Sequence, residues 1–459
     1  MATRTWSAAV DGVASLGANW SGATAPTTGD SVIFDGTSIK NCTWDITANM
    51  GDVTVNSAYT GTVTQTSAFN VTDATGTRIF TFNGGVWNSN GQTVSVRQFD
   101  ASGTATKTLS CGASAWTCGT LLNLSGSSLT FTPSTSVFTM NNAGTLTPHA
   151  STAFAGLTLD GTNGGTLTLG NNVTITGTFT MQNSVTIAGN FIIHAQGNIS
   201  RDNTTASISG SPTLTIDGGA NQTWSDNATG TMRLPVTINK SGNTLTLSGT
   251  INLYNGPFTY TAGTVSAGTS TVVHNGTYNV ASNGMSFYNM SVDNSATVTL
   301  TSNLSVTNIL NIISGAGLTA SSYTITMGGN FTKGGTFTAN TSTVTFNGTS
   351  TVSGTITFNN LTINSGKVVH LTSTQTFTVS GAFTTLGTST LDATTGGSRA
   401  NLSVNGSQSV TGVTATDIDS SGGSVKPIHN SAGSNTNTVQ WDIPSTAVNI
   451  IKAMLMGIG

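Results

Sequence analysis

The chain has 459 residues and a formal net charge of −3, yet only 6% of its residues are charged, whereas a typical soluble domain carries about 25%. All 16 acidic residues are Asp, and Gly, Thr, Ser, Asn and Val dominate, so good helix formers are scarce and a largely helical protein is excluded. Nucleic-acid binding is not expected either, because neutralising phosphates requires clustered Lys and Arg, and only 13 such residues occur.

Residues 1–128 are distinguished by their tryptophans. They contain five of the seven in the chain, namely Trp6, Trp20, Trp44, Trp87 and Trp116. Strand-like runs occur at 31–34, 53–55 and 78–82, which indicates a β-rich cap or head module or, alternatively, the first irregular coils of a solenoid. Packing in a core or cap is the more favoured role for these tryptophans, ahead of stacking on sugars.

Residues 129–443 combine alternation with internal repetition. From 173 to 193 apolar residues recur at every second position, as in a half-buried strand. A four-residue phrase ending in Asp or Asn recurs at 157–160, 236–239, 290–293 and 361–364. The intervals of 79, 54 and 71 residues could each hold about three coils of 20 to 25 residues. We therefore predict an all-β fold, a right-handed parallel β-solenoid.

The last position of this phrase is Asp160, Asn239, Asp293 or Asn364. A catalytic base would not tolerate Asn, whereas both residue types bond the backbone of a turn. The series therefore predicts turns.

Residues 444–459 form the third predicted segment, a short apolar helix with Ser445 as its N-cap. Its apolar stripe contains Val448, Ile451, Met454 and Leu455. Such a helix could cover the open end of the solenoid or dock into a partner subunit, and the sequence favours neither.

Three stretches of the chain carry a resemblance. Residues 342–383 (STVTFNGTSTVSGTITFNNLTINSGKVVHLTSTQTFTVSGAF) resemble the β-helical surface repeats of bacterial adhesin-like proteins and of phage structural proteins. Residues 413–443 resemble the terminal coil of such arrays, and residues 19–45 resemble a module that commonly begins them. The resemblance implies surface structure and attachment, and it brings no shared catalytic residues.

Cysteines and histidines offer little chemistry. Cys111 and Cys118 flank a loop that a disulfide could close, and buried free thiols are the alternative. The five histidines are His149, His194, His274, His370 and His429. They are scattered along the chain, so we predict neither a metal site nor a cofactor.

Asp417 and Asp419 are the best carboxylate pair. In a strand, positions i and i+2 face the same side, as glycoside hydrolysis would require of two carboxyl groups. The pair could equally bind Ca²⁺, or it could cap backbone amides beside the turn at 420–423.

These observations predict a non-enzymatic structural or attachment protein. The chain shows no secretory leader and no membrane span, which favours a virion protein, either a phage fibre or a capsid decoration, over an exported adhesin. Expected partners are other virion proteins, further copies of the chain (a trimer is one form) and host-surface polysaccharide. A bacterial adhesin or surface-layer protein is the first alternative, and a tailspike-like polysaccharide depolymerase is the second.

Overall fold

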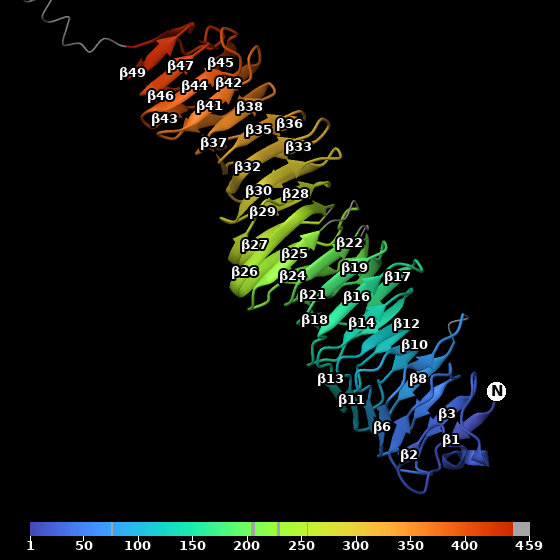
Figure 1. Cartoon of the computed structure of the whole chain (residues 1–459). Helices are drawn as coiled ribbons and strands as arrows, with labels where there is room; N and C mark the ends of the chain where they lie inside the picture. Colours follow the sequence, from blue (N-terminus) through green and yellow to red (C-terminus); the bar gives the residue numbers. More distant parts are fainter. Residues whose placement is uncertain (75–76, 203–206, 227–229, 255, 444–459) are drawn as a thin grey trace, which may run out of the picture. The chain divides into compact units, whose positions relative to one another are not determined.

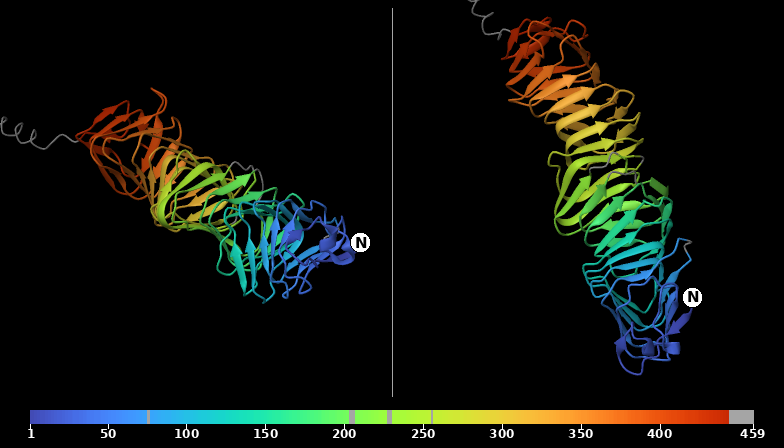
Figure 2. Two further views of the ribbon diagram at one scale, coloured as in Figure 1. Left: turned by 60° about the horizontal axis from the view of Figure 1, so that its bottom comes forward. Right: turned by 45° about the vertical axis from the view of Figure 1, so that its right-hand side comes forward.

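A computed structural model describes residues 1–74, 77–202, 207–226, 230–254 and 256–443 of the chain. It is an all-β structure in which short parallel strands wind into a β-solenoid of about 19 turns, and the helical segments among the described residues are two short 3-10 turns. The chain divides into two compact units, residues 1–247 with 261–266 and residues 248–260 with 267–459. In each unit the strands of successive coils lie side by side (Figures 1 and 2).

The first unit contains two short 3-10 turns, η1 (Gly17–Asn19) and η2 (Ser21–Ala23), and 25 whole strands. The strands are β1 (Thr3–Thr5), β2 (Gly12–Val13), β3 (Ser31–Phe34), β4 (Cys42–Trp44), β5 (Val53–Val55), β6 (Thr62–Gln65), β7 (Phe69–Val71), β8 (Ile79–Phe82), β9 (Val86–Asn88), β10 (Val94–Asp100), β11 (Lys107–Ser110), β12 (Ala115–Asn123), β13 (Leu129–Thr132), β14 (Val137–Met140), β15 (Gly144–Thr147), β16 (Gly156–Asp160), β17 (Thr166–Leu169), β18 (Val173–Ile175), β19 (Phe179–Gln182), β20 (Thr186–Gly189), β21 (Ile192–Ala195), β22 (Ile199–Asp202), β23 (Ser207–Gly210), β24 (Thr213–Ile216) and β25 (Gln222–Asp226).

Two longer strands, β26 (Val236–Leu253) and β27 (Phe258–Ser266), contribute residues to both units. The strands of the second unit are β28 (Thr271–His274), β29 (Tyr278–Ala281), β30 (Ser286–Val292), β31 (Thr297–Leu300), β32 (Leu304–Ile312), β33 (Gly317–Thr319), β34 (Thr324–Met327), β35 (Asn330–Lys333), β36 (Thr336–Thr338), β37 (Thr343–Phe346), β38 (Ser350–Ser353), β39 (Ile356–Phe358), β40 (Asn360–Ile363), β41 (Val368–Leu371), β42 (Thr376–Val379), β43 (Phe383–Thr385), β44 (Ser389–Ala393), β45 (Ala400–Val404), β46 (Gln408–Thr411), β47 (Val413–Thr416), β48 (Ile418–Asp419), β49 (Ile428–Ser431), β50 (Ser434–Thr436) and β51 (Trp441–Asp442).

Alternation of apolar and hydroxyl side chains explains the inside and outside of each coil. In β42, Phe377 and Val379 are buried, whereas Thr376 and Thr378 are partly exposed. A strand places successive side chains on opposite faces, so the apolar set fills the interior and the threonines face solvent. The predicted alternation is therefore confirmed.

Each strand pairs in parallel with a strand of the next coil, and the paired residues define the coil length. Asp160 pairs with Gln182, 22 residues later, and Arg201 pairs with Asp226, 25 residues later. The coil between Thr343 and Asn360 is shorter, at 17 residues. The coil between Gly12 and Cys42 is longer, at 30 residues, so the observed coils extend both below and above the predicted 20 to 25 residues.

The parallel ladder continues through the predicted boundary at residue 128. β11 pairs with β13, and β12 pairs with both β14 and β15. All five N-terminal tryptophans are buried, and Trp6 packs edge-on against Trp20 at a centroid distance of 5.1 Å. Residues 1–128 are therefore themselves coils of a solenoid with an aromatic interior, as in the alternative prediction of irregular first coils.

Turns follow Asp160, Asp293 and Asn364 as predicted, but the prediction is wrong for Asn239, which lies inside strand β26. Asp160 accepts the backbone N–H of Thr162 at 2.8 Å, and Asp293 accepts that of Asn294 at 2.7 Å. Such short carboxylate bonds close a turn immediately after a strand.

The C-terminal prediction concerns residues that the structure does not describe. The predicted helix at 444–459, with Val448, Ile451, Met454 and Leu455, lies outside the described residues. Among the described residues, no helix has the length and apolar character needed to cross a membrane.

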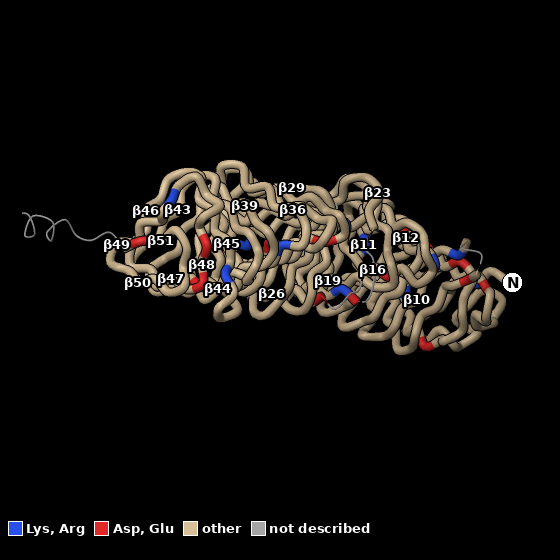
Figure 3. Tube along the Cα trace, turned by 90° about the horizontal axis from the view of Figure 1, so that it is seen from above, with Lys and Arg blue, Asp and Glu red and all other residues tan. Residues whose placement is uncertain are grey.

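Charged residues are sparse along both units (Figure 3). Part of this small charge is placed inside, because Arg201 and Asp226 form an ion pair of 2.8 Å with no exposed side-chain surface. The polar surface therefore consists mainly of hydroxyl and amide groups.

Candidate functional site: a polar hollow on three coils

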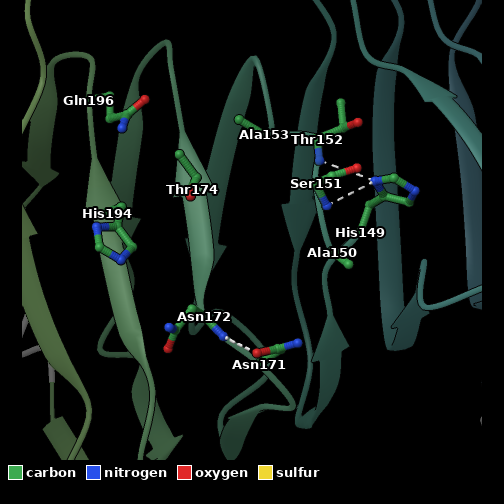
Figure 4. Close-up of a pocket in the computed structure, with 10 residues that line it drawn as sticks. All are labelled: His149, Ala150, Ser151, Thr152, Ala153, Asn171, Asn172, Thr174, His194 and Gln196. Atoms are coloured by element: carbon green, nitrogen blue, oxygen red, sulfur yellow. Dashed lines mark hydrogen bonds between the residues drawn. The ribbon is translucent and has the colours of Figure 1, made fainter.

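A hollow of about 520 Å³ opens on the first unit where the segment 149–153 lies beside β18 and β21 (Figure 4). We call it the His194 hollow. Its lining residues are neutral and mostly polar, namely His149, Ala150, Ser151, Thr152, Ala153, Asn171, Asn172, Thr174, His194 and Gln196. Three successive coils contribute them, so residues about 20 positions apart in the chain meet in one place.

His149 holds the wall of the hollow in place. Its Nδ1 accepts the backbone N–H groups of Ser151 at 3.4 Å and Thr152 at 3.1 Å, and its Nε2 lies 3.0 Å from the carbonyl oxygen of Leu129 (Figure 4). Because Nδ1 accepts, Nε2 must carry the proton that it donates to Leu129. Both ring nitrogens are thus used to shape the segment.

His194 has a free ring nitrogen at the other side of the hollow. It stands beside Thr174 in the ladder, and its Nδ1 lies 2.6 Å from Oδ2 of Asp217 on the following coil. A proton on Nδ1 is donated to this carboxylate, and in the corresponding neutral tautomer Nε2 is an acceptor. Within the described part of the chain, Nε2 of His194 has no hydrogen-bond partner.

The two asparagines supply donors. Oδ1 of Asn171 accepts the N–H of Asn172 at 2.8 Å, and Oδ1 of Asn172 accepts the N–H of Ile192 at 2.8 Å. Each amide oxygen is therefore occupied, and each Nδ2 group remains available as a donor of two hydrogen bonds. With the hydroxyl of Thr174, the hollow offers donors and acceptors without a formal charge.

Such a lining suits a neutral polyhydroxyl ligand. A phosphate or sulfate would require Lys, Arg or a set of backbone N–H groups, and none of the ten lining residues is Lys, Arg, Asp or Glu. A sugar carries hydroxyl groups that both donate and accept, so it can use Nε2 of His194 and the Asn Nδ2 groups together.

The aspartate pair at 417 and 419 is placed differently from the strand prediction. Asp417 lies between β47 and β48 with a φ of 58°, so the backbone turns there and the i, i+2 rule does not apply. Asn437 Nδ2 and the N–H of Gly397 donate to its carboxylate, and Ser421 donates its N–H to Asp419 at 2.8 Å. The prediction of one strand face is wrong. Capping beside the turn at 420–423 is confirmed for Asp419, whereas Asp417 accepts the N–H of Gly397 on the preceding coil.

Both carboxyl groups have a lowered pKa. For Asp417 the hydrogen bonds from Asn437 and Gly397 lower the pKa. For Asp419 burial opposes the shift, but the hydrogen bonds from Ser421 bring the pKa below its usual value. A general acid of a glycoside hydrolase needs the opposite, a raised pKa.

The three cysteines are buried free thiols. Cys111 and Cys118 do not form the predicted disulfide in the structure, and Cys42 is also free. Burial raises the pKa of Cys111 to about 12, and it raises the pKa of Cys118 further. Thiols that stay protonated are poor nucleophiles and poor metal ligands.

Sequence reasoning missed a recurring His–Asp arrangement. His370 lies 2.5 Å from Asp392, and His429 lies 2.7 Å from Asp442, each across adjacent coils as in the His194 pair. The signal that could have found the His370–Asp392 and His194–Asp217 pairs is their separation of 22 and 23 residues, which corresponds to one coil. No group of three or more His, Cys or Asp residues that could hold a metal ion occurs in the described ranges.

Comparison with known proteins gives no identity to add to this geometry. No protein-family model, curated protein or solved structure matches the chain.

Proposed function

We propose that this chain is a non-enzymatic structural and attachment protein of a virus particle, either a phage fibre or a capsid decoration protein. The resemblance of residues 342–383 and 413–443 to β-helical surface repeats supports this proposal. The β-solenoid is compatible with it, since the fold presents the same kind of surface on coil after coil.

The single observation that carries the proposal is the polar surface with few charges, on which side chains of neighbouring coils are joined by hydrogen bonds. Asn308 Nδ2 donates to Asn289 Oδ1 at 2.8 Å on the neighbouring coil, and Asn364 Nδ2 donates to Asn347 Oδ1 at 3.1 Å. Bonds of this kind order the outer face without ions, so salt and pH outside a cell would disturb it little. This property is suited to a protein that works in exposed surroundings.

Attachment would use the His194 hollow as a contact for neutral host-surface glycans. One such contact is weak, but many copies on one particle raise the overall avidity by several orders of magnitude. The protein would therefore act as an oligomer, with other virion proteins as its anchor, and the residues at 448–455 are the proposed docking segment.

Electron microscopy of the native assembly tests the location. We expect discrete copies at capsid or tail positions of a particle, detected by labelling with an antibody against this chain. A continuous cell-surface array with no capsid would contradict the proposal and leave the adhesin or surface-layer alternative.

Substitutions in the hollow test the attachment role. Asn172→Ala removes an Nδ2 donor, but it also removes the bond to the N–H of Ile192, so Asn172→Asp, which keeps that acceptor, is the sharper variant. We expect particles with Asn172→Asp to adsorb less to host cells. Asn330→Asp is the matched control, because Oδ1 of the exposed Asn330 accepts the N–H of Thr351 at 2.8 Å in the same way, outside the hollow. Equal adsorption by both variants and the parent would remove the hollow from the proposal.

The depolymerase alternative has a separate test. If the chain cleaved polysaccharide, Asp417→Asn and Asp419→Asn would abolish the release of reducing ends. We expect no such release from the parent protein, and measurable cleavage that these substitutions remove would overturn the non-enzymatic proposal.

A further inference from the structure

A second hollow, of about 470 Å³, lies on the final coils of the second unit, at β41, β44, β47 and β50 (the orange and red coils of Figure 1). We call it the Lys367 groove. Four successive coils line it, with Gly366, Lys367, Val368, Thr388, Ser389, Thr390, Gly412, Thr414, Ala432, Gly433 and Ser434. The groove therefore runs across the coils, whereas each strand runs along one coil.

Small residues keep the groove open. Gly366 and Gly412 have φ values of 73° and 70°, in the left-handed region where a side chain is strained. A Cβ at Gly412 would also approach the backbone of Gly387 to 2.9 Å. Gly412 therefore allows the backbone of the preceding coil to approach closely, whereas a Cβ at Gly366 would meet nothing within 4 Å.

One row of hydroxyl groups forms the floor. Thr390 pairs with Thr414, and Thr414 pairs with Ser434, so one hydroxyl is presented by each of three coils. The coils are about 4.8 Å apart, which is close to the length that each pyranose ring adds to an extended sugar chain. A linear oligosaccharide lying in the groove would thus meet one hydroxyl for each ring.

Lys367 is the only charged residue that lines the groove. Among the described residues no acidic group forms an ion pair with its amine. Asp392, two positions beyond Thr390 in β44, does not line the groove, and its carboxylate lies 2.5 Å from His370. The lining of the groove therefore contains one cation and no acidic residue.

We infer that the Lys367 groove binds an extended acidic oligosaccharide. A carboxylate of a uronic-acid unit meets the Lys367 amine, and the ring hydroxyls follow Thr390, Thr414 and Ser434 along the coils. Recognition of a single-stranded nucleic acid is disfavoured, because such ligands need several cations and stacking aromatic rings, and the groove has one cation and no aromatic residue. This inference rests on the proposed attachment function and adds a ligand class to it.

Calorimetric titration of the full chain with tetragalacturonate tests the inference. Lys367→Gln removes the charge, and we expect it to weaken binding by about fivefold or more, as loss of a charge-assisted hydrogen bond predicts. Lys333→Gln is the matched control, because Lys333 ends β35 in the same unit outside the groove. Equal losses in both variants would mean unspecific attraction and would overturn the site.

A second variant tests the hydroxyl row without changing charge. Thr414→Val keeps the β-branched shape and removes one hydroxyl, and we expect roughly threefold weaker binding of tetragalacturonate. Thr326→Val on β34 should leave binding unchanged. Equal affinity for maltotetraose, a neutral tetrasaccharide, with no effect of Lys367→Gln would also overturn the inference.

The binding experiments and the microscopy experiment can fail independently of each other. If microscopy finds no virus particle but galacturonate binding depends on Lys367, the virion proposal fails and the groove stands. If the particle is found and Lys367→Gln binds like the parent protein, the groove alone fails.

Discussion

The first coils and the coils of the second unit use one backbone plan with different interiors. In the first coils many interior side chains are rings in contact, in one group of Trp6, Trp20, Phe34 and Tyr59 and a larger group from Trp44 to Phe154. In the larger group the ring centroid of Phe80 lies within 5.1 Å of those of Phe69, Trp87 and Phe99. In the second unit the interior is mainly aliphatic, as at Leu318, Ile325 and Val344. The strand pairing is parallel in both.

The comparison shows that parallel strand pairing is common to both regions, whereas the interior side chains differ. We expect the size of these side chains to determine how far the effect of a substitution spreads along the coils. Ring contacts in the first coils reach two coils along, since the centroids of Trp44 and Trp87 are 6.5 Å apart, whereas Ile325 of the second unit pairs with Leu304 and Val344 on the directly adjacent coils. A substitution in the first coils should therefore destabilise a wider region. In the second unit the stability should be close to the sum of the stabilities of single coils and of the contacts between adjacent coils.

Trp87→Ala should give the largest effect. Trp87 lies 4.6 Å from both Phe69 and Phe80, and its Nε1 donates to Oε1 of the buried Gln65 at 2.9 Å. We expect a loss of about 3–5 kcal/mol of local stability from the cavity, with a further loss from the unsatisfied amide. Hydrogen exchange followed by mass spectrometry measures this loss coil by coil.

The matched substitution in the second unit is Leu318→Ala. We expect a loss of about 2–5 kcal/mol that is confined to the adjacent coils. The comparison would break if reduced protection spread as far from Leu318 as from Trp87.

Arg201→Met should follow in size. Arg201 and Asp226 are fully buried and form an ion pair on coils beyond the aromatic run. Arg201→Met removes the hydrogen bonds that the guanidinium donates to the buried carboxylate of Asp226, at a cost of about 3–5 kcal/mol. The double variant Arg201→Met, Asp226→Leu should recover most of this loss in thermal unfolding, and failure to recover would show that the pair has a structural role beyond charge compensation.

His274 makes one aromatic cluster of the second unit sensitive to acid. Burial lowers its pKa from 6.5 to about 3, and its Nδ1 is 2.8 Å from the Tyr278 hydroxyl. Below pH 6.5 the unfolded chain binds a proton that the folded chain does not, so stability falls with falling pH by up to about 1.4 kcal/mol per unit until pH 3. Above pH 6.5 this contribution is complete.

Chemical denaturation between pH 4 and pH 7 measures that slope. The control is His274→Phe with Tyr278→Phe, which removes the titrating ring without leaving a buried hydroxyl unpaired. We expect a smaller slope in the control by the stated amount, and an unchanged slope would assign the acid sensitivity to carboxyl groups.

Period-two alternation made the strands and the coil architecture predictable from sequence, because burial of one face depends on residue type alone. Two features of the candidate sites were not predictable in this way. The His194 hollow depends on a register that joins Thr174 to His194 across a coil, and coil length varies too much to be read in advance. The position of Asp417 depends on a left-handed backbone angle, which the alternating pattern does not reveal.

Ile325→Val should give the smallest effect. It tests directly whether an aliphatic side chain of the second unit is coupled only to the adjacent coils. Ile325 pairs with Leu304 on one coil and with Val344 on the next, so loss of one methyl group should cost about 0.5–1.5 kcal/mol. Val344→Ala on the adjacent coil should be non-additive with it by about 0.5 kcal/mol or more, since the two cavities share a wall. Val379→Ala, on a more distant coil, should add simply to Ile325→Val. Chemical denaturation of the two double variants measures this. If the losses in free energy of unfolding were additive in both, adjacent aliphatic coils would not be coupled, which would contradict the expectation that each coil depends on its direct neighbours.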